Sequence, residues 1–277
     1  MAVKVVTDSA SDIPTELAEG LGISVVPCTV FFGAEAFKDG VEITKEEFFN
    51  RLTTGNIMPT TTQPSVGDFL DVYRPLAEAG HDIVSVHVSG KLSGTVNSAR
   101  LAAEELPNTT VEIVDTELAS MGVALAAKAA ADAATGGANA AEAAEAARSS
   151  AANTEVFVVP DTLEYLKRGG RIGGAQALLG SLLSMKPILK LMDGEVHPHE
   201  KVRTKGKAVQ RMRDIAASGG SYREAAVMHW VTDEEANAMV EHLAGFTANP
   251  VVSGAIGASI GAHAGPGVIG FAVVKES

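Results

Sequence analysis

Short apolar runs alternate along the chain with longer segments in which apolar residues recur at helical spacing. The runs rich in β-branched residues predict buried strands at Val3–Thr7, Ser24–Val26, Ile83–Val88, Val111–Val114, Val156–Val159, Ala225–His229 and Val251–Ser253. The segments between them predict helices at Pro14–Glu19, Lys45–Leu52, Gly67–Ala79, Thr95–Glu105, Thr204–Ala217 and Asp233–Leu243. This alternation indicates an α/β fold with largely parallel sheets, whose ligand sites lie beyond the carboxyl ends of the strands.

A change of composition near the middle of the chain indicates a domain boundary. Residues 119–152 include 18 alanines, the residue with the highest helix propensity. Gly136 and Gly137 interrupt this segment, and Asn139 followed by Glu142 resembles a capping box that opens a second helix. We therefore expect two α/β domains, the first over residues 1–153 and the second over residues 154–277, with a ligand site between them.

Composition and charge narrow the class of protein. Hydrophobic residues form 46% of the 277, which is enough for a substantial core. Acidic residues outnumber basic ones by 34 to 22, the opposite of the balance expected for a protein that binds a nucleic-acid backbone. The single cysteine, Cys28, cannot form an internal disulfide. With no signal-like start and no apolar run of membrane-spanning length, we expect a soluble, cytoplasmic protein without an integral membrane segment.

Polar, Gly-rich or Thr-rich segments fall in three predicted loops, at residues 59–65, 89–95 and 261–267. In the second of these, Ser93 is placed as an N-cap, which leaves the amides of Gly94 and Thr95 unpaired at the start of a helix. Its hydroxyl, the two amides and the positive helix end together make an anion site. Helix capping alone explains the same residues equally well. In the first loop, Ser65 with Asp68 can likewise cap a helix, while its threonines offer uncharged hydroxyl donors.

The third loop is preceded by a Gly-x-Ser-x-Gly pattern centred on Ser259, which is typical of a hydrolase nucleophile elbow. Such an elbow feeds a long helix, and an acidic residue and then a histidine follow it in the sequence. Here a Gly-rich loop begins two residues after the pattern, and only His263 follows, without an aspartate. We therefore reject Ser259 as a nucleophile and expect a short helical turn.

Motifs for metals and cofactors are weak or missing. The two histidines of His197-Pro198-His199 are candidate metal ligands, but the proline holds the pair extended and no cysteine joins them. The sequence has no G-x-x-x-x-G-K-[ST] loop, and no strand leads into the glycine run at residues 169–174. We expect no metal and no cofactor. Lys167, Arg168 and Arg171 form a small basic patch beside those glycines.

Five segments in order along the chain resemble motifs of the DegV family, whose fatty-acid-binding members serve bacterial fatty acid kinases. They are Val5-Val6-Thr7-Asp8-Ser9-Ala10-Ser11-Asp12-Ile13-Pro14, Thr61-Thr62-Gln63-Pro64-Ser65, Ser89-Gly90-Lys91-Leu92-Ser93-Gly94-Thr95, Leu166-Lys167-Arg168-Gly169-Gly170-Arg171-Ile172 and His263-Ala264-Gly265-Pro266-Gly267. The family usually has serine where this chain has Thr62 and Gly90. The resemblance spans nearly the whole chain.

The resemblance implies a two-domain α/β fold that binds one long-chain fatty acid between its domains. The residues that it assigns to the carboxylate are Thr61, Ser93, Gly94, Thr95 and His263. It implies a lipid-binding carrier without catalysis of its own, which presents the carboxylate to a separate ATP-dependent kinase that makes acyl-phosphate. For the acyl-chain tunnel of the second domain we expect Leu178, Leu179, Leu182, Leu183, Met185, Ile188, Leu189 and Leu191.

Two alternatives stay open at the level of sequence. One is a stand-alone hydrolase or transferase that uses Ser93 or His263, for which Asp8, Asp12 or Asp115 would have to orient the reactive group. The other is a regulatory module that binds another small carboxylate. Arg171 has two interpretations as well, because it either docks the partner kinase or holds its own loop.

Overall fold

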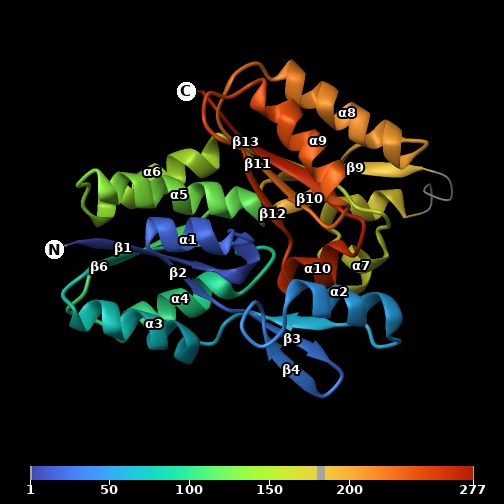
Figure 1. The fold of residues 1–277 in the computed structure, drawn as a ribbon. Helices are drawn as coiled ribbons and strands as arrows, with labels where there is room; N and C mark the ends of the chain where they lie inside the picture. The colour runs from blue at the N-terminus through green and yellow to red at the C-terminus, as the bar shows by residue number, and fades with distance from the viewer. Residues whose placement is uncertain (1, 180–184, 277) are drawn as a thin grey trace.

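The computed structural model describes residues 2–179 and 185–276, and its first sheet has four parallel strands in the order β2-β1-β6-β7 (Figure 1). These strands are β1 (Val3–Asp8), β2 (Ile23–Val26), β6 (Asp82–His87) and β7 (Val111–Asp115). One face of the sheet packs on α3 (Val66–Glu78) and α4 (Thr95–Glu104). The other face packs on α5 (Met121–Thr135) and α6 (Ala140–Ala152), with α1 (Thr15–Leu21) beside α5. A short 3-10 turn, η1 (Ser9–Ser11), follows β1.

The second sheet has six strands in the order β10-β9-β8-β13-β11-β12. They are β8 (Thr154–Val159), β9 (Lys186–Met192), β10 (Glu195–Val202), β11 (Tyr222–His229), β12 (Val252–Ala255) and β13 (Ile269–Lys275). Helices α8 (Lys205–Ser218) and α9 (Asp233–Ala244) cover one face. The connections contain α7 (Glu164–Arg168), the 3-10 helix η2 (Gly173–Leu178) and α10 (Ala258–Ala264).

The α/β class is confirmed and the first sheet is parallel as expected, but the expectation of a largely parallel second sheet is wrong. Four of its five neighbouring strand pairs are antiparallel, and only β11 and β12 run parallel. Part of the reason is local. Asp193 and Gly194 have φ of 50° and 76°, the conformation of a two-residue hairpin turn, so β9 and β10 fold back on each other. The remainder comes from β13, which returns between β8 and β11 in the opposite direction.

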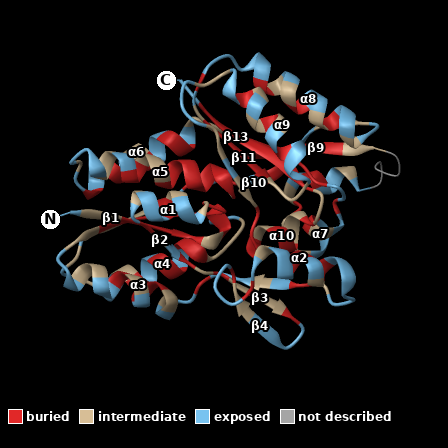
Figure 2. Ribbon diagram, in the orientation of Figure 1, coloured by how far each residue is buried: buried red, intermediate tan, exposed pale blue. Residues whose placement is uncertain are grey.

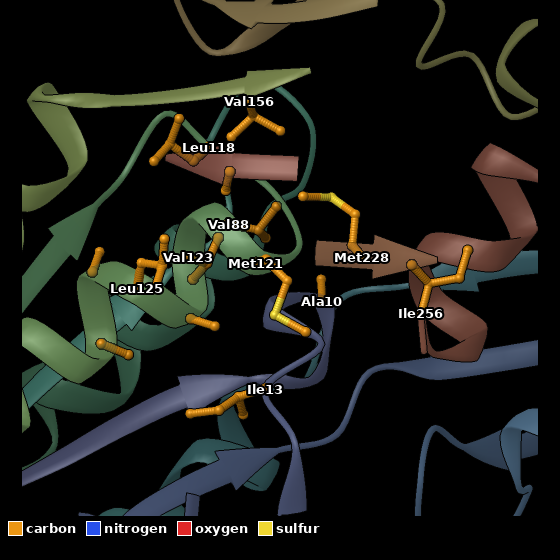
Figure 3. Packing of buried hydrophobic residues seen from close by; sticks show 14 of the residues in the cluster. Ala10, Ile13, Val88, Leu118, Met121, Val123, Leu125, Val156, Met228 and Ile256 are labelled. Atoms are coloured by element: carbon orange, nitrogen blue, oxygen red, sulfur yellow. The ribbon is translucent and has the colours of Figure 1, made fainter. Parts of the chain in front are cut away.

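Helix α5 lies between the two sheets and packs against both (Figure 1). Figure 2 shows its first half as buried, and its small side chains allow a close approach of the neighbouring elements. The predicted pair of Ala-rich helices is confirmed, together with the capping box between Asn139 and Glu142. Figure 3 shows Met121 and Leu118 near the start of α5, with Val156 and Met228 of the second sheet close by.

A third, antiparallel sheet of β4 (Glu35–Lys38), β3 (Thr29–Phe32) and β5 (Thr60–Thr62) stands beside α2 (Lys45–Thr54). The sequence had predicted a loop where β5 forms. This region belongs to the first half of the chain but packs on α10 of the second half: Phe48 and Phe49 lie against Gly261, and the Phe49 ring stacks on Trp230 at 3.9 Å. The four-stranded sheet lies within residues 1–153 and the six-stranded sheet within 154–277, and the domain division itself stays a prediction.

Within residues 2–179 and 185–276, none of the helices combines the length and apolar character needed to cross a lipid bilayer.

Two helical glycines test how tightly α5 is packed. A Cβ on Gly122 would lie 2.9 Å from Val156 Cγ2 and 3.1 Å from Leu118 Cβ, whereas a Cβ on Gly20 of α1 would meet nothing within 4 Å. We expect Gly122→Ala to lower the free energy of unfolding by about 1–3 kcal/mol through overpacking. Gly20→Ala, the matched control, should raise it by up to about 1 kcal/mol because alanine favours the helix. Urea denaturation measures both, and equal stabilisation by the two substitutions would contradict this packing.

Candidate functional site

A cavity lies between the two sheets. Its walls are mainly apolar and come from both halves of the chain: Ala10, Cys28, Val88, Leu92 and Ala119 from the first, and Val156, Val158, Leu166, Leu191, Val196, Met228, Ile260 and Ala264 from the second. Figure 3 shows Ala10, Val88, Val156 and Met228 approaching the same space from different elements. A ligand that fills this cavity is therefore mostly hydrocarbon.

Polar side chains from three separate segments line the same cavity. Thr61 of β5 and His263 of α10 are hydrogen-bonded, with Thr61 Oγ1 2.8 Å from His263 Nε2. Ser93 also lines the cavity, and its hydroxyl lies 2.8 Å from that of Thr95, which is fully buried behind it. Three of the five residues predicted to bind a carboxylate thus face the cavity, and Thr95 supports one of them.

The start of α4 differs from the prediction in one detail. Gly94, not Ser93, is the N-cap, because the Ser93 hydroxyl pairs with Thr95 instead of a backbone amide of the first turn. A Cβ on Gly94 would lie 2.8 Å from Gln63 Nε2, so the end of the Gln63 side chain would have to move to admit any other residue there. The positive end of the α4 dipole is therefore next to Ser93, where it favours an anion.

Arg171 joins two of the loops around the cavity. Its Nε donates to the carbonyl oxygen of Leu92 at 3.0 Å, and its Nη1 donates to that of Gly169 at 2.8 Å. The side chain is partly buried and lines the cavity. The other members of the predicted basic patch are exposed, and Arg168 pairs with Glu164 at 2.6 Å. Arg171 thus holds its loop and also places a positive charge at the cavity wall.

His263 is electrically neutral at physiological pH. Burial, with a smaller contribution from the charge of Arg171, lowers the pKa of its imidazole to about 4. Its Nδ1 is buried and has no hydrogen-bond partner within the part of the chain that the structure describes. Gly169 passes so close that a Cβ there would lie 2.1 Å from Nδ1. A neutral imidazole in this position can donate one hydrogen bond to a ligand or accept one from Thr61.

The residues predicted for the acyl tunnel have mixed positions. Leu191 lines the cavity, whereas Ile188 packs on the opposite side of the sheet, in the cluster beneath α8 and α9. Leu189 is buried in the central core, Leu178 packs against that core, Met185 is partly buried and Leu179 is exposed. Leu182 and Leu183 lie outside the described residues. Much of the observed wall comes instead from alternate residues of β8, Val156 and Val158, which the sequence analysis assigned to a strand but not to the site.

The three carboxylates considered for a catalytic role are hydrogen-bonded to other groups. Asp8 Oδ2 lies 2.8 Å from His87 Nδ1 in a fully buried pair. Asp115 accepts the amide hydrogen of Gly90, and Asp12 accepts that of Gly257 at 2.6 Å. Within the described residues, none of the three is hydrogen-bonded to Ser93 or His263, the groups that it would have to orient. The geometry therefore disfavours a nucleophile activated by a base.

The structure also shows the surroundings of Ser259 and of His199, two further candidates from the sequence. Ser259 lies in the short helix α10, as expected, and its hydroxyl donates to Asp39 Oδ2 at 2.5 Å. His199 packs its ring edge against Phe157 at 5.1 Å. Over residues 2–179 and 185–276, no group of three His, Cys, Asp or Glu side chains is placed to hold a metal ion. The arrangement suits an amphiphilic anion with a hydrocarbon body and a carboxylate-like end.

Comparison with known proteins gives consistent matches over the whole chain. The model of the family described as "Uncharacterised protein, DegV family" matches residues 2–276. A DegV domain-containing protein of Streptomyces coelicolor is 43% identical over 277 residues, covering 98% of each chain. Two solved structures cover 100% of both chains: a DegV family protein of Thermus thermophilus described by its fatty acid binding (37% identity, TM-score 0.92), and DegV of Bacillus subtilis, described as a fatty acid binding protein (32%, 0.89).

The electrostatics of His263 give a test that needs no ligand. We expect the His263 ring to show no protonation step by NMR at pH values above about 5, because its pKa is lowered to about 4. Since the folded state holds the pKa below its ordinary value of 6.5, this residue should cost stability as the pH falls from that value toward 4. Arg171→Gln removes the second cause and should raise the pKa only partly, because burial remains. A His263 that titrates at its ordinary pKa in the folded protein would contradict the described environment.

Proposed function

The chain belongs to the DegV family, and from this premise we propose that it binds a long-chain fatty acid and presents the carboxylate to a separate ATP-dependent kinase. The observation that carries the proposal is a largely apolar cavity lined at one part by Thr61, Ser93 and His263. The acyl chain occupies the apolar part and the carboxylate meets the hydroxyls and the imidazole. Gly94 and Thr95 support the carboxylate site from the start of α4.

The free energy of such binding comes mainly from the acyl chain. Burial contributes about 0.8 kcal/mol for each CH₂, so a long chain gains several kcal/mol without any chemical step. A buried carboxylate without partners would cost several kcal/mol, which is why the hydroxyls, the helix end and Arg171 matter. A small polar carboxylate would leave the apolar walls of this cavity without a hydrocarbon partner. The cavity therefore favours a fatty acid over the smaller carboxylates of a regulatory module.

The proposed carrier role is non-enzymatic. The cavity offers hydrogen-bond donors but, among the described residues, no carboxylate paired with His263 or Ser93 for nucleophilic attack. The sequence also lacks a G-x-x-x-x-G-K-[ST] phosphate loop. Phosphorylation of the bound carboxylate therefore requires a partner kinase that brings its own ATP, and we place both proteins in the cytoplasm.

The first test is the ligand itself. One long-chain fatty acid per chain should copurify from a bacterial host and be identified by mass spectrometry of the extracted lipid. Ser93→Ala, Thr61→Ala and His263→Ala should each weaken fatty-acid affinity about tenfold or more, because each removes a hydrogen bond to a charged group. Asn139→Ala, which removes a helix cap far from the cavity, should lower stability by about 1 kcal/mol without changing affinity. An empty protein that also fails to bind added fatty acid would refute the proposal.

Substitution of Arg171 distinguishes a role in ligand binding from a role in kinase docking. If its main role is to meet the kinase, Arg171→Ala should leave fatty-acid affinity nearly intact and lower kinase-dependent acyl-phosphate formation. The loss should be larger at low salt, where charge steers association most strongly. If Arg171 acts on the carboxylate from the cavity wall, affinity itself should fall. Equal affinity and equal kinase turnover for both proteins at low and high salt would exclude both roles.

A further inference from the structure

Two buried carboxylates from the first half of the chain hold the start of α10. Asp12 Oδ1 accepts the amide hydrogen of Gly257 at 2.6 Å. Asp39 Oδ1 accepts from the Ala258 amide at 3.0 Å, and its Oδ2 accepts from the amide and hydroxyl of Ser259 at 2.9 and 2.5 Å. The first amides of a helix have no partner within the helix, so these contacts satisfy them from outside. We refer to Asp12 and Asp39 as the carboxyl clamp.

The clamp is crowded and strained. A Cβ on Gly257 would lie 3.2 Å from both oxygens of Asp39 and 3.3 Å from Asp12 Oδ1, so the two carboxylates flank this glycine. Asp12 has φ of 53° and accepts a short hydrogen bond from the hydroxyl of Ser120, whose own φ is 54°. Residues other than glycine adopt such backbone conformations only where the surroundings enforce them, and they gather at functional sites.

The helix that the clamp holds also carries the proposed carboxylate site. His263 follows Ser259 by four residues, which places it on the same face of α10 about 6 Å further along the axis. Helix α10 has only seven residues, too few to be stable without external contacts. Ser120 and Ser259, which bond to the two clamp carboxylates, line the cavity as well. The residues that bond to the clamp therefore also form part of the cavity wall.

We infer that Asp12 and Asp39 are positioning residues for the carboxylate site: they fix the start of α10 and thereby set His263 against Thr61. This inference rests on the proposed function, because it gives α10 a role in holding a fatty acid. Neither residue reaches the ligand headgroup itself. Their effect passes through the backbone of α10, which Phe48 and Phe49 hold from the other side at Gly261.

The stability of the closed clamp should also depend on pH. Burial, with a small contribution from the charge of Asp39, raises the pKa of Asp12 to about 7, although Lys45 and the hydrogen bonds from Ser120 and Gly257 act in the opposite direction. The other titratable groups around the cluster are His229, which faces Lys45, and Cys28, which faces Asp39. Lys45 donates a hydrogen bond to the carbonyl oxygen of Ala255, just before α10.

An opened clamp exposes Asp12 to water and returns its pKa toward the ordinary value of 3.8. The closed clamp therefore binds a proton more tightly than the open one. Closure is fully favoured below about pH 4, weakens by up to about tenfold for each pH unit between about 4 and 7, and no longer depends on pH above that. Fatty-acid affinity should accordingly fall between about pH 4 and pH 7 and then level off.

Two clamp variants and one control test the positioning role. Asp39→Asn turns an amide group toward the donors of Ser259, and Ser259→Ala removes only the hydroxyl contact and keeps the helix residues otherwise intact. Both should raise the pKa of His263 toward 6.5 in the ligand-free protein, measured by NMR, and lower oleate affinity about tenfold by calorimetry. Asn139→Ala should change neither. Unchanged His263 titration and oleate affinity in both folded clamp variants would overturn the inference.

A third variant tests the proton. Asp12→Asn resembles the protonated acid, since its oxygen can accept from Gly257 and its amide can donate to Ser120. It should keep oleate affinity and remove the fall in affinity between about pH 4 and pH 7. The same pH dependence in this variant and the unmutated protein would contradict the proton linkage. If the unmutated protein binds no oleate, the proposed function fails, while the His263 titrations of the clamp variants still decide the positioning role.

Discussion

The packing of α5 between two β-sheets is the constraint on which the site depends. The first half of the helix, Met121–Ala127, is apolar and buried, so it requires a surface on both sides, and the two sheets supply them. Its alanines keep those sheets close together along its length. The helix begins at Met121. The cavity lies just before this residue, between the two sheets, and Ala119 and Ser120 line it. A binding cavity thus arises where a core helix begins.

The polar side of the cavity follows from strand direction. In a parallel sheet the carboxyl ends of the strands share one edge, and the loops after β1 and β6 bring Ala10, Val88 and Ser93 to that edge. The second sheet contributes only apolar wall from β8 to β11, and the histidine comes from α10, which precedes β13. The strands of the second sheet thus supply apolar wall, whereas the hydroxyls and the imidazole come from β5, the loop after β6 and α10. An amphiphile matches both.

Burial of charged groups near this cavity lowers the free energy of unfolding. Asp12 and Asp39 lie close together beneath the surface, and positive φ angles at Asp12 and Ser120 add strain. Hydrogen bonds from the start of α10 offset part of this cost. By contrast, the buried Asp8–His87 pair connects through Ser85 to Tyr73 of α3, where each group has a partner. The second network braces the loop after β6, and its members lie outside the cavity wall.

Local pattern in the sequence determined much of this protein. The strands of the first sheet, the paired Ala-rich helices and the capping boxes all follow from periodicity and from residues close together in the chain, because those interactions are local. Motif resemblance drew attention to Thr61, Ser93 and His263. Only the tertiary structure decided that β13 enters the second sheet antiparallel, that Val156 and Val158 form the wall in place of Ile188, and that Asp12 and Asp39 meet α10. Those contacts join residues far apart in sequence, and alternation along a strand does not tell which face borders an unfilled space.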